Sequence, residues 1–86
     1  MDIETMVLRT NGFKIGKLRT DGSRTITKTA FALSAGKTFT FAVEVPAEGE
    51  PTLVITEGGR ELGRKTDTWA EIASEAVALA FKVERS

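Results

Sequence analysis

Three glycine-containing dipeptides divide the first half of the chain and limit how it can fold. Asn11-Gly12, Asp21-Gly22 and Ala35-Gly36 separate segments that are rich in β-branched and aromatic residues. Asn-Gly and Asp-Gly favour two-residue hairpin turns, because both central residues of such a turn need a positive φ. The pattern therefore predicts four strands joined by tight turns: Ile3–Thr10, Phe13–Thr20, Arg24–Leu33 and Lys37–Val45.

Two-residue turns fix the strand register, and this register separates apolar from polar side chains. The predicted pairs are Thr10 with Phe13, Thr20 with Ser23, and Ser34 with Lys37. One face then collects Met6, Leu8, Phe13, Ile15, Ile26, Ala30, Ala32, Phe39, Phe41, Val43 and Val45. The other collects Thr5, Arg9, Lys14, Gly16, Thr25, Thr27, Thr29, Thr38, Thr40 and Glu44. A slip of one residue would mix the two sets, so the pattern indicates an antiparallel meander with one buried face.

Two lysines, Lys17 and Lys28, fall on the buried side of this sheet. We expect them at its margin, with their stems packed and their ammonium groups in water. The second half of the chain predicts a fifth strand at Thr52–Glu57, and Gly58-Gly59 opens a hairpin into a weak sixth strand at Arg60–Arg64.

A helix is predicted over Thr68–Val83. Thr68 and Glu71 have the spacing of a capping box. Apolar residues recur at three- and four-residue intervals along the segment: Trp69, Ile72, Ala73, Ala76, Leu79, Ala80 and Val83. We expect Trp69 to anchor the helix near Phe39 and Phe41. The predicted fold class is α+β, an antiparallel β-meander of four to six strands with one C-terminal α-helix packed on one face, in a single small domain over residues 1–86.

Two further residues of the helix, Val77 and Phe81, widen its apolar arc beyond what one sheet usually covers. Contact with the hairpin between the fifth and sixth strands is one explanation. The alternative is a homodimer interface, because the interfaces of obligate dimers resemble a core cut in half.

The zero net charge of the chain conceals an uneven distribution. Residues 1–43 hold seven basic and three acidic residues, a balance of +4, and residues 44–86 hold five basic and nine acidic residues, a balance of −4. The basic residues cluster between positions 9 and 28: Arg9, Lys14, Lys17, Arg19, Arg24 and Lys28. We predict that these six bind a partner with an acidic surface, because such asymmetry steers association.

Few side chains are suited to catalysis, because the chain has no Cys, His or Tyr. Disulfides, thiol nucleophiles, Cys/His zinc sites and a histidine base are therefore excluded. The segment from Gly58 to Thr66 approaches a phosphate-binding loop, but Arg64 separates Gly63 from Lys65 and breaks the spacing. The glutamates near Pro46–Pro51 lie in a segment typical of a solvated loop. We expect no enzymatic activity and no cofactor or metal.

The predicted layout, a sheet followed by a C-terminal helix, resembles integrase arm-binding and AP2-type DNA-binding domains. The likeness lies in the element order and implies that the basic segment Arg9–Lys28 could contact nucleic acid as a β-sheet binder. Small phage-encoded anti-defence proteins such as anti-CRISPR proteins have a similar size and lack of catalytic residues. We therefore predict a non-enzymatic protein-binding module, an inhibitor or adaptor, with nucleic-acid binding as the alternative. The acidic N-terminus and the absence of a long apolar run predict a cytoplasmic protein without membrane contact.

Overall fold

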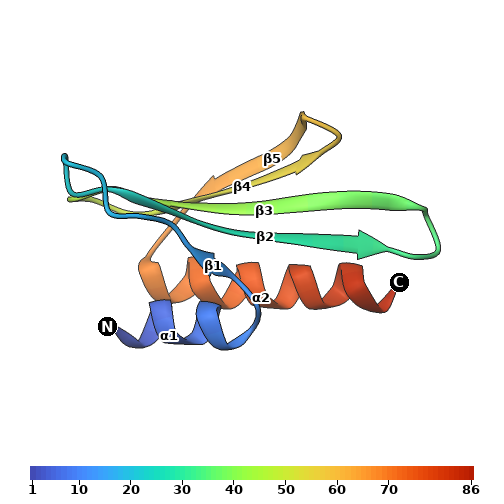
Figure 1. Ribbon diagram of the computed structural model, residues 1–86, viewed down its shortest axis with the longest axis horizontal. Coiled ribbons are helices and arrows are strands. Elements are labelled where there is room, and N and C mark those ends of the chain that lie inside the picture. The colour runs from blue at the N-terminus through green and yellow to red at the C-terminus, as the bar shows by residue number, and fades with distance from the viewer.

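The computed structural model describes residues 1–86 as two helices and a five-stranded antiparallel sheet (Figure 1). The elements are α1 (Ile3–Thr10), β1 (Lys14–Ile15), β2 (Arg24–Ala32), β3 (Lys37–Val45), β4 (Thr52–Glu57), β5 (Arg60–Thr66) and α2 (Trp69–Arg85). The strand order is β1-β2-β3-β4-β5, so every neighbour in the sheet is also a neighbour in sequence. Both helices lie on the same side of the sheet (Figure 1). The predicted α+β meander with a C-terminal helix on one face is confirmed.

The first predicted strand is wrong, because Ile3–Thr10 forms the helix α1. Asp2 caps its N-terminus, where Oδ1 accepts a hydrogen bond of 2.9 Å from the backbone N–H of Thr5. Glu4 in the first turn and Arg9 in the last turn have the signs that the helix dipole favours. A cap residue followed by an acidic first turn is a helix start signal, and it outweighs the alternation of polar and apolar residues.

The predicted Asn11-Gly12 hairpin turn is the C-terminal end of α1. The backbone N–H of Asn11 donates to the carbonyls of Val7 and Leu8, and Gly12 follows with a φ of 88°. A residue with positive φ just after the last turn is a common helix terminator. The same dipeptide therefore serves a helix end as well as a hairpin, and local sequence does not distinguish the two uses.

The second predicted strand, Phe13–Thr20, is much shorter than expected. Only Lys14 and Ile15 pair with β2, and Gly16 adds one hydrogen bond of 2.9 Å to the carbonyl of Thr25. A Cβ at position 16 would lie 2.2 Å from that carbonyl oxygen, so glycine is required for this close approach. The rest of the segment is a loop that turns at Asp21-Gly22.

The observed register differs from the predicted one by two residues in both tested hairpins. Lys37 pairs with Ala32 rather than Ser34, and Lys14 pairs with Thr27 rather than Thr29. Because side chains alternate with a period of two, an even shift leaves each residue on its predicted face. The apolar face of the sheet is accordingly the one that packs against the helices.

The core lies between the sheet and the two helices. Eleven buried residues form one cluster: Leu8, Phe13, Ile26, Ala30, Phe41, Val43, Leu53, Ile72, Ala73, Ala76 and Ala80. Three of the four contributions from α2 are alanines, which let the helix approach the sheet closely. Strand β4 has its predicted bounds, and β5 extends two residues beyond the expected Arg64.

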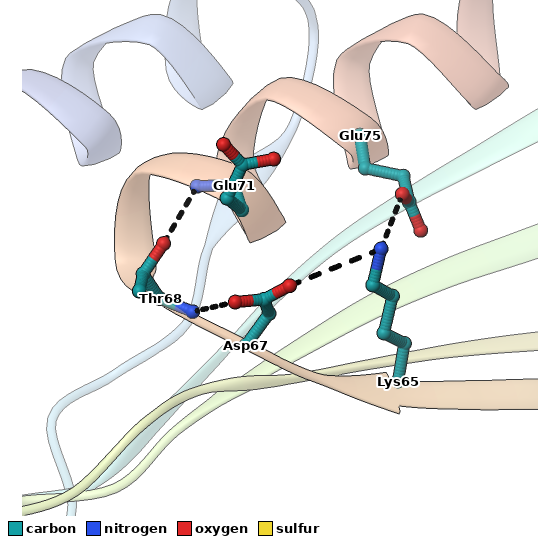
Figure 2. A network of polar contacts seen from close by, with 5 residues as sticks. All are labelled: Lys65, Asp67, Thr68, Glu71 and Glu75. Atoms are coloured by element: carbon teal, nitrogen blue, oxygen red, sulfur yellow. Dashed lines mark hydrogen bonds and ion pairs between the residues drawn. The ribbon is translucent and has the colours of Figure 1, made fainter.

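The predicted C-terminal helix is confirmed, with Thr68 as its N-cap (Figure 2). Oγ1 of Thr68 accepts a hydrogen bond of 3.3 Å from the backbone N–H of Glu71. In a complete capping box, the side chain of Glu71 would accept a hydrogen bond from the backbone N–H of Thr68. Here that N–H donates instead to Oδ1 of Asp67 at 2.7 Å. Lys65 then ties the end of β5 to α2 through an ion pair of 2.9 Å with Glu75.

The expected place of Trp69 near Phe39 is wrong. Trp69 is the first residue of α2, and its indole Nε1 lies 3.2 Å from Oδ2 of Asp2. Phe39 lies near the β2–β3 turn, next to the opposite end of α2, where the backbone N–H of Ser34 donates to the carbonyl of Ser86. Trp69 is half-buried and packs at the edge of the core.

Candidate functional site

The six basic residues singled out in the sequence lie on several parts of the fold. Arg9 is in the last turn of α1, and Lys17 and Arg19 are in the loop after β1. Lys14 pairs with Thr27, so it lies on the face of the sheet that neither helix covers, which we call the open face. Arg24 and Lys28 alternate with Thr25 and Thr27 on β2 and lie on the helix side. The fold does not bring the six together into one patch.

Arg19 is held by contacts with its own loop and with the start of β2. Its Nε donates to Oγ of Ser23 at 2.9 Å and its Nη2 to Oγ1 of Thr25 at 3.2 Å. Ser23 in turn donates from both its backbone N–H and its hydroxyl to Oδ1 of Asp21. These bonds from Ser23 lower the pKa of the Asp21 carboxyl, and the nearby Arg19 charge acts in the same direction. The loop thus presents Arg19 next to a compensating carboxylate.

Lys28 is occupied by contacts that hold the helices to the sheet. Its Nζ donates a hydrogen bond of 2.8 Å to the carbonyl of Asn11, at the end of α1. The same ammonium lies 3.2 Å from Oε1 of Glu84 on α2. The side chain is only 16% exposed, so the expectation of an ammonium group in water is corrected: Lys28 joins β2 to both helices. Lys17, by contrast, is exposed.

The open face carries most of the chain's threonines, as the alternation predicted. Thr25, Thr27, Thr29, Thr38, Thr40, Thr52, Thr56 and Thr66 occupy it. Two pairs of its polar groups are in contact: Thr52 of β4 with Thr66 of β5 at 2.7 Å, and, within β5, Arg64 with both carboxylate oxygens of Glu61 at 2.8 and 3.1 Å. This bond lowers the pKa of Glu61 and raises that of Arg64. Phe31 is the large apolar side chain exposed here, at 51%.

Apolar surface gathers on the opposite side of the molecule, where a groove runs between α1 and α2. The groove has a volume of about 460 Å³, and six of its eight lining residues are hydrophobic. The eight lining residues are Ile3, Glu4 and Val7 from α1, and Ala70, Ala73, Ser74, Val77 and Ala78 from α2. We call this set the helical groove. Ile3 and Val7 lie one turn apart on α1, so they form a continuous apolar wall.

Phe81 extends this apolar surface along α2. Its side chain is 52% exposed, and the guanidinium of Arg85 lies 5.3 Å from the centre of its ring. Phe81 follows Val77 by four residues, so both lie on the same line of the helix. In the sequence, Val77 and Phe81 widened the apolar arc of the helix beyond what one sheet covers. In the structure, Val77 lines the helical groove and Phe81 lies next to it on α2.

The α1 side of the helical groove was not predicted from the sequence. Ile3 and Val7 were assigned to a strand, on which a groove between two helices cannot form. The signal that could have found them is the Asp2 cap with Glu4 in the first turn. Elsewhere, no three acidic side chains lie where they could hold a metal ion. Neither helix is long and apolar enough to cross a membrane.

Comparison of this chain with models of protein families, with curated proteins and with solved structures gave no match. The likeness to integrase arm-binding and AP2-type domains therefore has no support from these comparisons, and the helix α1 before the sheet departs from the element order on which it was based.

Proposed function

We propose that this protein is a non-enzymatic protein-binding module that acts by contact, as an inhibitor or adaptor, and that the helical groove is its binding surface. The observation that carries the proposal is the helical groove itself: an open, mostly apolar groove of about 460 Å³ between two helices, continued by the exposed Phe81. Contiguous exposed apolar surface of this kind marks interaction sites on soluble proteins.

The composition of the helical groove suits a protein partner. Its walls are aliphatic, with the carboxylate of Glu4 and the hydroxyl of Ser74 as polar groups. Burying Ile3, Val7 and Phe81 against a partner would remove apolar area from water at roughly 25 cal/mol per Å². Aromatic anchors such as Phe81, surrounded by smaller apolar contacts, are typical centres of protein interfaces.

Nucleic-acid binding has less support from the fold. A phosphate-binding surface needs several cations on one face. Here Lys28 is committed to Asn11 and Glu84, and Arg19 is next to Asp21. The remaining cations of the basic segment lie on different faces. We propose that these cations form the positive end of the molecule and increase the rate of association with an acidic partner.

Affinity capture with matched variants tests the proposal. Ala78→Glu places a carboxylate in the helical groove at an exposed helix position that tolerates glutamate. Thr29→Glu adds the same charge to the open face. We expect a protein captured from lysate by the wild-type chain and by Thr29→Glu, with or without nuclease, but not by Ala78→Glu. The captured protein is then identified and its binding is measured with purified components.

Two results would contradict the proposal. Capture that persists with Ala78→Glu and disappears with Thr29→Glu would place binding on the open face. Capture that nuclease abolishes would favour the nucleic-acid alternative. Circular dichroism of both variants confirms that any loss of binding is not a loss of fold.

A further inference from the structure

The helical groove and Phe81 lie on one surface of the same chain, in positions that two copies can exchange. The helix α1 ends at Thr10 and lies beside the first half of α2, whereas Phe81 stands near the other end of α2 (Figure 1). We propose that the groove accepts Phe81 of a second copy, in a two-fold dimer whose α2 helices run antiparallel. The inference rests on the proposed function, because it uses the same groove and names its occupant.

The periodicity of α2 supports this exchange. Residues eleven apart lie on the same line of an α-helix, three turns from each other. Ala70 and Phe81 share one such line on the α1 side, and Glu71 and Lys82 share the adjacent line on the other flank. A two-fold axis perpendicular to α2 makes the α2 helices of the two copies antiparallel. Each line of residues then lies against the same line of the second copy. Phe81 then reaches the Ala70 end of the groove, and Lys82 reaches Glu71.

Charge complementarity supports the same arrangement. Glu71 and Lys82 are both exposed, and neither forms an ion pair within its own chain. Antiparallel helices bring the acidic start of one α2 to the basic end of the other. Because the interface is isologous, each pair occurs twice. A parallel arrangement would instead place like charges together.

The midpoint of this interface is sterically open. Ser74 and Ala78 lie between the two charged ends, and small side chains there let two helices approach to about 8–10 Å. A helix of this length spans about 25 Å, and with α1 beside it two such surfaces would bury on the order of 1,000 Å². That area is near the lower limit for a specific interface, so we expect micromolar rather than nanomolar association.

Sedimentation equilibrium tests the dimer. Between about 1 µM and 1 mM, the weight-average mass should rise from 9.3 kDa toward twice that value. Phe81→Ala and Ala78→Glu should each weaken association by about tenfold or more, whereas Thr29→Glu should leave it unchanged. Phe81 is exposed, so its truncation leaves the monomer folded.

A charge exchange tests the antiparallel pairing specifically. Glu71→Lys and Lys82→Glu should each weaken association, and the double variant should recover it, because only then do opposite charges face each other again. A double variant no tighter than either single one would overturn the antiparallel arrangement. A chain that stays at 9.3 kDa throughout would overturn the dimer. Capture of another protein that Ala78→Glu abolishes would then still support the proposed function, so the two failures are distinguishable.

Discussion

The indole Nε1 of Trp69 donates a hydrogen bond of 3.2 Å to Oδ2 of Asp2, across 67 residues of sequence. The other carboxylate oxygen of Asp2 accepts the backbone N–H of Thr5 and caps α1. One side chain therefore begins α1 and holds it against the first residue of α2. Because the helical groove exists only while the two helices are adjacent, Asp2 supports the candidate site without lining it.

Removal of the Asp2 cap should destabilise the protein. Asp2→Ala should lower the free energy of unfolding by about 1 kcal/mol, because the N–H of Thr5 loses its acceptor. Asp2→Asn should lower it less, since asparagine also caps helices well. Urea denaturation at pH 7 measures both, and equal losses in the two variants would show that capping is not the main contribution.

The same residue predicts a pH dependence. Hydrogen bonds from Thr5, and to a smaller extent from Trp69, hold the pKa of Asp2 below its usual 3.8. A carboxyl whose folded pKa is depressed contributes stability above its unfolded pKa, and that contribution is lost as pH falls through the folded pKa. The stability difference between wild type and Asp2→Asn should therefore shrink below about pH 4. A difference that is constant from pH 7 to the acid end would contradict this account.

Leu8 and Met6 distinguish the helix from the predicted strand. On a strand, residues two apart share a face, whereas on α1 Leu8 is fully buried and Met6 is 52% exposed. Leu8→Ala should cost about 2–5 kcal/mol of unfolding free energy, and Met6→Ala less than about 0.5 kcal/mol. Thermal or chemical denaturation of the two variants measures these changes. Similar losses of unfolding free energy at the two positions would favour the strand.

Lys28 should behave as a structural residue. Lys28→Met keeps the packed stem but removes the ammonium that contacts Asn11 and Glu84, so we expect a loss of about 1–2 kcal/mol. Lys17→Met is the matched control, because Lys17 is exposed and should change stability by less than about 0.5 kcal/mol. Indistinguishable denaturation midpoints for the two variants would argue against this role.

The sheet was predictable from the sequence because its determinants are local. The alternation in β2 and β3 assigns each residue to a face, and an error of two residues in turn length leaves that assignment intact. The start of α2 was similarly marked, by the Thr68 cap and the apolar spacing that follows.

The candidate site was less predictable because it depends on α1. This helix is only eight residues long and buries only Thr5 and Leu8, so its helical period extends over little more than two turns, and a strand alternation fits the same residues. Its stability comes from the contact with α2, and tertiary packing of this kind is invisible to local patterns. The opposite faces of Lys14 and Lys28 followed from strand alternation, but the contacts of Lys28 with Asn11 and Glu84 depend on how the two helices pack and were not predictable.

Photo-crosslinking at two phenylalanines tests the central claim most directly. Phe81 and Phe31 are almost equally exposed, at 52% and 51%, but Phe81 continues the helical groove and Phe31 lies on the open face. A benzoyl-phenylalanine replaces each in turn, and the chain is irradiated in lysate. We expect protein adducts, including adducts with a second copy of this chain, from position 81 and not from position 31. Adducts from position 31 alone would contradict it.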